Sequence, residues 1–280
     1  MGKILVLGSK GVLGGQLMKV FGNEAVGWDR RDCDVTDFAN LKSKILNFKP
    51  LPEVIINCAA YNNVDGSENN QDLAFKLNAD VPKNLAEICK ELDIIFVHFS
   101  TNYIFDGVLG EYNESDVPKP LSVYGKSKYQ GEREVQKYLD KYYIIRTAVL
   151  FGPKGESGLS KKSFVDIMLD SGEKQSEIKV ITDEVNSITY SVDLTTQVKL
   201  LLNQGKPYGI YHITNSGFGS WYDLAKEIFN IVGKGINLVP ISSADFHRKA
   251  KRPKKSVLLN TKLSEFRPWQ EALREFLHKD

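Results

Sequence analysis

The 280-residue chain is 42% apolar and 26% charged, which is typical of a folded globular protein with a sizeable core and excludes a disordered or fibrous one. Its 37 basic and 35 acidic residues nearly cancel, so net charge favours neither nucleic acid nor an anionic membrane as a partner. Three widely spaced cysteines without a CxxC pair argue against a disulfide framework or structural zinc. The four histidines lack metal-ligand spacing, and we predict no metal.

The N-terminus passes from Met-Gly-Lys straight into "ILVLG", an apolar run too short for a signal peptide. No later apolar stretch approaches the length of a membrane span. We therefore predict a cytoplasmic protein with no membrane and no nucleic acid as partner. The oligomeric state is left open between monomer and homodimer.

Short apolar runs alternate with amphipathic stretches through the first half of the chain. Runs with the length and β-branched content of buried strands are 3–8, 53–60, 94–100 and 142–151, with a short second strand around 25–28. Helices are predicted between them at 13–22, 37–48, 71–91 and 124–139. This alternation predicts an α/β fold with right-handed crossovers and a doubly wound parallel sheet of the Rossmann type.

The pattern changes after about residue 152. The stretch "GPKGESGLSKKS" (152–163) indicates a loop, and it precedes predicted helices at 163–171, 191–203 and 220–233 and strands at 177–182 and 209–214. We predict a dinucleotide-binding domain over 1–152. Residues 153–280 are expected partly to return to the sheet and partly to form a small C-terminal substrate-binding lobe over the strand ends, where ligands of such sheets bind.

A glycine triplet follows the first predicted strand. Gly8, Gly11 and Gly14 stand at the strand-to-helix turn, where they allow a tight turn and a close approach of the backbone to a pyrophosphate at the helix N-terminus. Asp29, at the end of the second strand, stands where a carboxylate bonds the ribose hydroxyls of NAD. Arg30 follows at once and can accommodate the 2′-phosphate of NADP, so both cofactors remain open.

Two features have two interpretations each. Asp34 in "CDVTD" is either a helix cap or a hydrogen-bond partner of the adenine edge. The basic run "RKAKRPKK" (248–255) is either a solvated loop or a landing place for a phosphate-bearing ligand, since guanidinium and ammonium groups pair well with phosphate.

The stretch "YGKSKYQGE" puts Tyr124 and Lys128 four residues apart, on one face of a helix. A tyrosine of reference pKa about 10 is a poor acid, and we expect the lysine ammonium to lower that pKa, so that the phenol donates a proton to a carbonyl oxygen as hydride arrives on carbon. Lys128 also has the reach to hold the nicotinamide ribose. Thr101, at the end of an apolar strand, is expected to hydrogen-bond the substrate carbonyl, with Ser100 nearer the cofactor.

This ordered set of motifs resembles the extended short-chain dehydrogenase/reductases, and within them the dTDP-4-dehydrorhamnose reductase branch. The similar patterns run through nearly the whole chain, in the same order. They are "CDVTD", "INCAAYNNVDGSE", "FSTNYIFDG", "YGKSKYQGE", "IIRTAVLFG", "GIYHITNSGFGSWYDLA" and "RPKKSVLLNTKL".

The resemblance implies a catalytic triad of Thr101, Tyr124 and Lys128. It implies reduction of the 4-keto group of a dTDP-linked 6-deoxyhexulose to dTDP-L-rhamnose, with hydride from NADPH or NADH. Besides Asp29, Arg30, Ser100 and the triad, the cofactor site would be lined by Gly8, Gly11, Val12, Leu13, Asp34, Val35, Ala59, Ala60, Tyr61 and Asn62. The candidate substrate-binding residues are Thr101, Asn102, Tyr103, Val149 and Arg252.

Three positions depart from the common family pattern. Asn102 stands where an aspartate is usual, Val149 near the place of a tryptophan, and "DEVNSIT" (183–189) replaces "DQxGxPT". Because none of these touches the triad, they leave open sequence drift or a reductase of a different nucleotide 4-keto sugar. A further alternative is a cofactor-binding regulatory subunit resembling the beta subunit of methionine adenosyltransferase.

Overall fold

A six-stranded parallel sheet forms the centre of the computed structural model, which describes residues 3–156 and 162–278. The strand order is β2-β1-β3-β4-β6-β11. These strands are β1 (Ile4–Leu7), β2 (Ala25–Trp28), β3 (Val54–Asn57), β4 (Ile95–Thr101), β6 (Tyr142–Thr147) and β11 (Gly209–His212). The sheet confirms the predicted α/β class. Of the loop predicted at 152–163, residues 157–161 lie outside the described residues.

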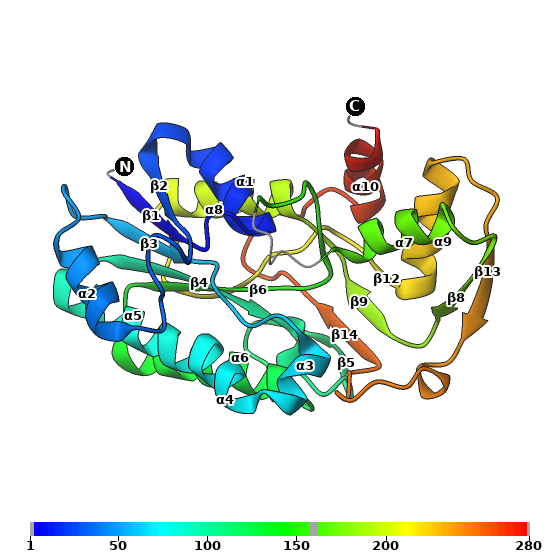
Figure 1. Ribbon diagram of the computed structural model, residues 1–280, viewed down its shortest axis with the longest axis horizontal. Helices are drawn as coiled ribbons and strands as arrows, with labels where there is room; N and C mark the ends of the chain where they lie inside the picture. The colour runs from blue at the N-terminus through cyan, green and yellow to red at the C-terminus, as the bar shows by residue number, and fades with distance from the viewer. Residues whose placement is uncertain (1–2, 157–161, 279–280) are drawn as a thin grey trace.

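Helices cover both faces of this sheet (Figure 1). On one face lie α1 (Val12–Phe21) and α8 (Ser191–Asn203), and on the other lie α2 (Phe38–Leu46), α5 (Val81–Leu92) and α6 (Val123–Tyr138). Alternate residues of β1 serve the two cores: Ile4 and Val6 face the first, and Leu5 and Leu7 face the second. Burial on both faces explains why the strands read as unbroken apolar runs rather than as an alternating pattern.

The strand order reverses between β1 and β3. The chain leaves β1 for β2 on one side and then crosses back to β3 on the other, which makes a topological switch point at the carboxyl ends of β1 and β3. Gly8 has a φ of +78° there, and a Cβ on it would lie 3.0 Å from the backbone nitrogen of Ala59. Only glycine fits this turn without strain.

The helix predicted at 71–91 contains a π-helical turn. It consists of α4 (Gln71–Phe75), a π-helical turn η2 (Lys76–Asp80) and α5, and the short helix α3 (Val64–Asn69) precedes it. The prediction of a helix over 71–91 is therefore confirmed, with a π turn in its middle that the sequence did not indicate. Such π turns are frequent at functional sites.

A second lobe lies beyond the carboxyl ends of the sheet (Figure 1). Its strands form three small sheets, in the order β12-β9-β14-β5, β13-β8 and β10-β7. The strands are β5 (Gly110–Tyr112), β7 (Leu150–Phe151), β8 (Glu177–Ile181), β9 (Val185–Ser187), β10 (Thr189–Tyr190), β12 (Phe218–Ser220), β13 (Asn237–Ile241) and β14 (Lys255–Leu258). The helices α7 (Phe164–Gly172), α9 (Trp221–Ile231) and α10 (Trp269–Leu277) pack on them around a separate apolar core.

The second lobe and the central sheet exchange segments. Strand β11 from the second half of the chain completes the large sheet, whereas β5 from the first half pairs with β14. Helices α7 and α9 each begin with a capping box, at Ser163 and Ser220. The remaining short turns are η1 (Gly22–Glu24), η3 (Asn102–Ile104) and η4 (Ser243–Asp245). In residues 3–156 and 162–278, no helix combines the length and the apolar character needed to cross a bilayer.

Candidate functional site

The glycine-rich turn opens α1 in the geometry of an anion site. Gly11 is the N-cap, no side chain caps the helix, and the N–H of Gly11 donates to the carbonyl of Gly8 at 3.1 Å. A Cβ on Gly14 would lie 2.2 Å from that same carbonyl oxygen. Val12 and Leu13 form the first turn, whose N–H groups face outward from the helix start. This backbone fits the pyrophosphate of a dinucleotide.

Asp29 is already neutralised by a lysine of the glycine-rich turn. Its Oδ2 lies 2.5 Å from Nζ of Lys10, and its Oδ1 accepts the N–H of Arg31 at 2.7 Å. The hydrogen bond from Lys10, together with that N–H, holds the pKa of Asp29 at about 2. Lys10 was not among the residues predicted from the sequence. Its ammonium makes the ribose end of the site less repulsive to a 2′-phosphate than an isolated carboxylate would be.

Asp34 is not the cap of the following helix. Asp37 is, accepting the N–H of Asn40, whereas Oδ1 of Asp34 accepts the N–H of Thr36 at 3.0 Å in a local turn. The guanidinium of Arg30 is largely exposed, with its Nε 3.8 Å from Oδ2 of Asp34. Both side chains therefore stay near the end of β2, and the cap interpretation of Asp34 is corrected.

The loop after β3 is held in place by a buried asparagine that the sequence analysis missed. Oδ1 of Asn78, in η2, accepts the N–H of Tyr61 at 2.8 Å, and its Nδ2 donates to the carbonyl of Tyr61 and to Oγ of Ser127. The N–H of Ala59 donates to Oδ1 of Asn57 at 3.1 Å. The signal in the sequence was a polar residue inside an apolar helical pattern. Among the other predicted cofactor contacts, Ala60 is half-buried, Asn62 is exposed, and Val35 packs against the core.

Helix α6 approaches its neighbours closely because of two glycines. A Cβ on Gly125 would lie 2.2 Å from the carbonyl oxygen of Tyr103, and one on Gly131 would lie 2.1 Å from the carbonyl oxygen of Asn78. Ser122 caps the helix by accepting the N–H of Gly125 at 3.1 Å. The helix is thereby pressed against η3 and η2, at the carboxyl end of β4.

Tyr124 and Lys128 lie on the buried face of α6, as their spacing predicts, but their electrostatics differ from the prediction. Burial raises the pKa of Tyr124 to about 12, against a lowering effect of a hydrogen bond with Thr101. Burial also lowers the pKa of Lys128 to about 8, and Nζ of Lys128 donates to the carbonyl of Phe99 at 2.5 Å. The pKa of Tyr124 is thus raised rather than lowered as expected, because burial of the phenol is the dominant effect.

Thr101 and Ser100 end β4. In the parallel register with β6, Thr101 lies opposite Thr147, and its Oγ1 accepts the N–H of Tyr103 at 3.2 Å. Ser100 is buried, and its Oγ has no hydrogen-bond partner among residues 3–156 and 162–278. An unpartnered buried hydroxyl is costly, so Ser100 fits a ligand group at this strand end.

We expected Asn102 to contact the substrate, but its side chain is buried and bonded within the protein. It is 2% exposed, and its Nδ2 donates to Oδ1 of Asn186 at 2.8 Å and to Oγ of Ser256 at 2.7 Å. Its Oδ1 accepts from the Thr101 hydroxyl at 3.3 Å. The side-chain amide thus ties the strand end to β9 and β14. These contacts require a hydrogen-bond donor, which an asparagine amide supplies and an ionised aspartate does not.

Two other predicted substrate residues lie at the same end of the sheet. The ring of Tyr103 meets that of Tyr124 edge to face at 6.1 Å between centroids. Val149 follows β6 with a φ of +37°, a conformation that a β-branched residue rarely adopts. The N–H of Thr189 donates to the carbonyl of Val149 at 3.1 Å and helps to hold it there. Backbone strain of this kind clusters at functional sites.

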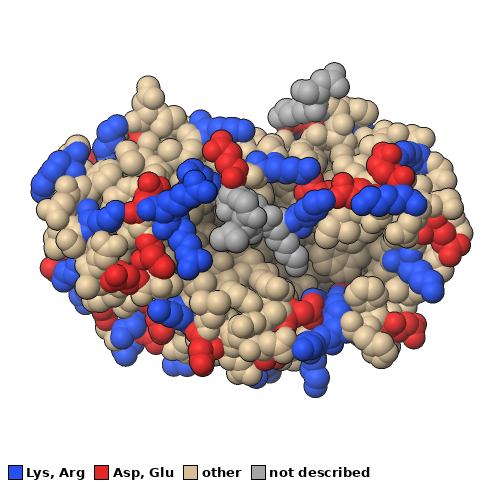
Figure 2. All heavy atoms as spheres, in the orientation of Figure 1, with Lys and Arg blue, Asp and Glu red and all other residues tan. Residues whose placement is uncertain are grey.

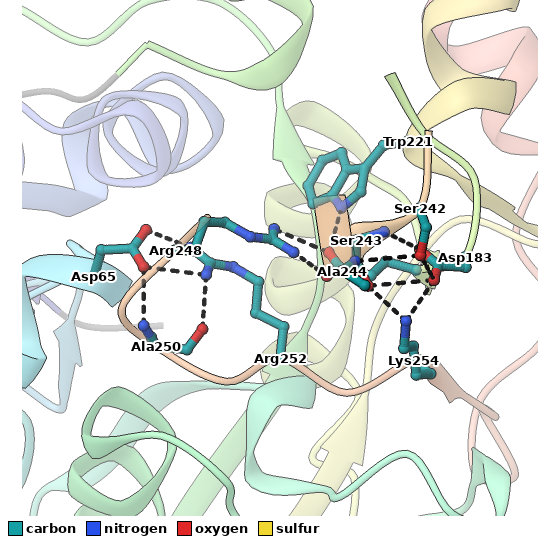
Figure 3. A network of polar contacts seen from close by, with 11 residues as sticks. Asp65, Asp183, Trp221, Ser242, Ser243, Ala244, Arg248, Ala250, Arg252 and Lys254 are labelled. Atoms are coloured by element: carbon teal, nitrogen blue, oxygen red, sulfur yellow. Dashed lines mark hydrogen bonds and ion pairs between the residues drawn. The ribbon is translucent and has the colours of Figure 1, made fainter. Parts of the chain in front are cut away.

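Residues 248–254, which we call the bridging segment, span from the sheet lobe to the second lobe (Figure 3). Nη2 of Arg252 lies 2.6 Å from Oδ2 of Asp65 in α3, and Nη1 of Arg248 lies 3.1 Å from Oε2 of Glu184. Both arginine side chains are largely buried, with 11% and 16% exposed. The prediction of a solvated loop is therefore wrong for these two residues.

The second-lobe end of the segment is equally well bonded. Nε1 of Trp221 donates to Oε2 of Glu184 at 3.1 Å, and Asp183 accepts the N–H of Ser243 at 2.7 Å and pairs with Lys254 (Figure 3). Glu184 thus serves Arg248 and Trp221 together, which requires a carboxylate at this position. Figure 2 shows the surface hollowed between the two lobes, with basic side chains at the edge of the hollow.

The comparisons with known proteins match the whole chain. A family model described as "RmlD substrate binding domain" matches residues 2–280. A protein named dTDP-4-dehydrorhamnose reductase from Aggregatibacter actinomycetemcomitans is 35% identical, over 98% of this chain and 98% of its own length.

Solved structures with the same name superpose closely. One from Clostridium acetobutylicum has a TM-score of 0.92 at 38% identity and covers 98% of both chains. One from Bacillus anthracis, in complex with NADP, has a TM-score of 0.93 at 32% identity and covers 100% of both chains. The chain therefore belongs to the RmlD substrate binding domain family.

Proposed function

We propose that this chain is an NADPH- or NADH-dependent oxidoreductase that reduces the 4-keto group of dTDP-4-dehydro-L-rhamnose to give dTDP-L-rhamnose. One observation carries the proposal: Tyr124 and Lys128 lie one turn apart on the buried face of α6, and the phenol of Tyr124 interacts with Thr101 at the carboxyl end of β4. The names of the full-length relatives support it, as does the NADP bound to the Bacillus anthracis protein.

The chain's own residues handle the proton, whereas the nicotinamide cofactor supplies the hydride that adds to the carbonyl carbon. Tyr124 donates its phenolic proton to the keto oxygen, and its pKa of about 12 keeps it protonated at neutral pH until that oxygen becomes basic. Thr101 hydrogen-bonds the same oxygen. Lys128 stabilises the phenolate that remains until solvent returns a proton, and holds the nicotinamide ribose.

The cofactor is held along the switch point. The glycine-rich turn with Val12 and Leu13 receives the pyrophosphate, and the Asp29 and Arg30 region receives the adenosine ribose. The loop 59–62 borders the middle of the cofactor. The Ser100 hydroxyl, which has no partner in the described part of the chain, hydrogen-bonds the cofactor at the end of β4.

The substrate is held between the lobes. Tyr103 and Val149 flank the sugar, and Arg252 and Arg248 bind the diphosphate by exchanging their carboxylate partners for phosphate oxygens. Asn102, and Glu184 within the departing segment 183–189, have structural partners of their own. Val149 is thus the departure that bears on the identity of the sugar.

The experiment is an assay with a panel of dTDP-, GDP- and UDP-linked 4-keto sugars, in which the absorbance of NADH and NADPH is followed separately. We expect turnover with dTDP-4-dehydrorhamnose and little with the GDP and UDP sugars. Oxidation that is faster with another 4-keto sugar would reassign the substrate. Tight NADPH binding without turnover of any sugar would overturn the proposal in favour of a regulatory subunit.

A further inference from the structure

A buried ion pair lies one turn beyond Lys128 on α6. Glu132 is fully buried, and its carboxylate forms a bidentate ion pair with Arg146 of β6. Nε of Arg146 donates to Oε1 at 3.0 Å and Nη2 donates to Oε2 at 2.8 Å. Arg146 also donates to the carbonyl of Glu114 and lies 5.4 Å over the ring of Phe105. The guanidinium is therefore fixed from several directions.

This pairing affects where Lys128 points. Residues four apart on a helix face each other, so Glu132 is the natural ion-pair partner of Lys128. Instead, Nζ of Lys128 donates to the carbonyl of Phe99 at 2.5 Å, and within the described part of the chain no carboxylate lies within ion-pair distance of it. Both oxygens of Glu132 are taken by Arg146.

We propose that Arg146 and Glu132 are positioning residues for the reaction: Arg146 occupies the Glu132 carboxylate and so leaves the ammonium of Lys128 directed at the carboxyl end of β4. Neither residue touches the reacting atoms. The inference rests on the role of Lys128 in the proposed function.

The charged and titratable groups that face Lys128 make Glu132 the decisive neighbour. Those that interact with Lys128 are Glu132 on α6, His98 of β4 and Cys58 directly after β3, whereas Arg146 of β6 pairs with Glu132 and Tyr124 lies one turn away on α6. Burial lowers the pKa of His98 and raises that of the Cys58 thiol, so both are neutral near pH 7. Burial lowers the pKa of Lys128 to about 8, and the carboxylate of Glu132 opposes that shift.

The test is an Arg146→Met variant, alone and combined with Glu132→Gln. In the single variant the freed carboxylate draws Lys128 down the helix. We expect kcat to fall about 10-fold or more, NADPH to bind more weakly, and the basic limb of the pH profile to move to higher pH, because an unpaired carboxylate raises the pKa of Lys128. In the double variant the attraction is gone, and kcat should return to within about 3-fold of the wild-type value.

An Arg267→Met variant is the matched control. It breaks a 2.7 Å ion pair with Asp193 in another part of the molecule, and we expect it to change thermal stability without moving kcat or the pH limb. If Arg146→Met does not fold, Arg146→Lys carries the test, since a lysine ammonium lacks the fork that binds both oxygens of Glu132.

Two results would overturn the inference. One is a wild-type kcat and pH limb in the folded single variant, and the other is a double variant as impaired as the single one. Both results are expected if the Arg146–Glu132 ion pair only stabilises the fold. A protein in which Tyr124→Phe stays fully active would instead overturn the proposed function, so the two failures are distinguishable.

Discussion

The strand-end site, formed by Thr101, Tyr124 and Lys128, and the bridging segment are built in opposite ways. The strand-end site stands on a strand end and the first turns of one helix, and all three side chains are buried. The bridging segment has little regular structure, and Arg248 and Arg252 are held by ion pairs to distant elements. In the proposed function, the residues that take part in proton transfer thus lie on fixed secondary-structure elements. The arginines that bind the substrate diphosphate have carboxylate partners that the diphosphate can replace.

This difference predicts which kinetic constant each region controls. Groups that act only in the transition state change kcat, whereas groups that bind the substrate equally before and during reaction change KM. Variants in the two regions therefore separate along these two constants.

The largest effect is expected from Tyr124→Phe. Removing the phenolic proton donor should lower kcat by about 10²- to 10⁴-fold, whereas NADPH binding and KM should change little, because the ring and its packing remain. Steady-state kinetics and cofactor titration measure both. Tyr129→Phe, on the same helix, is the matched control and should keep wild-type kinetics. A comparable rise in KM would contradict the assignment of pure chemistry to this site.

The next effect is expected from Arg252→Met. Losing a charge-assisted hydrogen bond to the diphosphate, worth about 1.5–3 kcal/mol, should raise KM roughly 10- to 150-fold and leave kcat within a few-fold. Asp65→Asn should not raise KM, because it frees Arg252 from its partner. Lys254→Met, at the other end of the segment, is the exposed control. A lower kcat at constant KM in Arg252→Met would show that the bridging segment acts on the chemical step and not only on substrate binding.

The strand-end site could be predicted from sequence because its geometry is local. The four-residue spacing of Tyr124 and Lys128 fixes their common helix face, and the glycine triplet fixes a strand-to-helix turn. The sheet followed from apolar runs of strand length. What the spacing did not give was the pKa of Tyr124, because desolvation depends on how closely α6 is packed.

The bridging segment could not be predicted because its contacts are distant in sequence. Arg252 and Asp65 are 187 positions apart, and Asn102 and Ser256 are 154 apart. Such pairs depend on the path of the loops, which no local pattern encodes. Asn102 and Glu184 therefore stood out as departures from a family pattern, and only the fold shows the partners that each one serves.

The rigidity of the strand-end site is tested by Gly131→Ala. A Cβ there would lie 2.1 Å from a backbone oxygen of Asn78, so α6 and η2 must separate, and we expect a loss of about 1–3 kcal/mol in the free energy of unfolding. Gly235→Ala, whose Cβ would meet nothing within 4 Å, should stay within about 0.5 kcal/mol of the wild type in the same urea titration. Equal stability of the two variants would mean that the helix is not held closely.

The smallest effect is expected at the ribose end of the cofactor site. There, as in the bridging segment, a carboxylate is paired with a cation, but the Lys10–Asp29 pair is more exposed to solvent. In Lys10→Met the carboxylate of Asp29 loses the ammonium 2.5 Å away and repels a 2′-phosphate, so KM for NADPH should rise about two- to five-fold relative to KM for NADH. The change should shrink at high salt, because exposed charges are screened. Lys19→Met, at the other end of α1, is the control. An unchanged ratio of KM for NADPH to KM for NADH would mean that Lys10 does not affect cofactor preference. Ion pairing of a carboxylate would then influence ligand binding only in the buried pairs of the bridging segment.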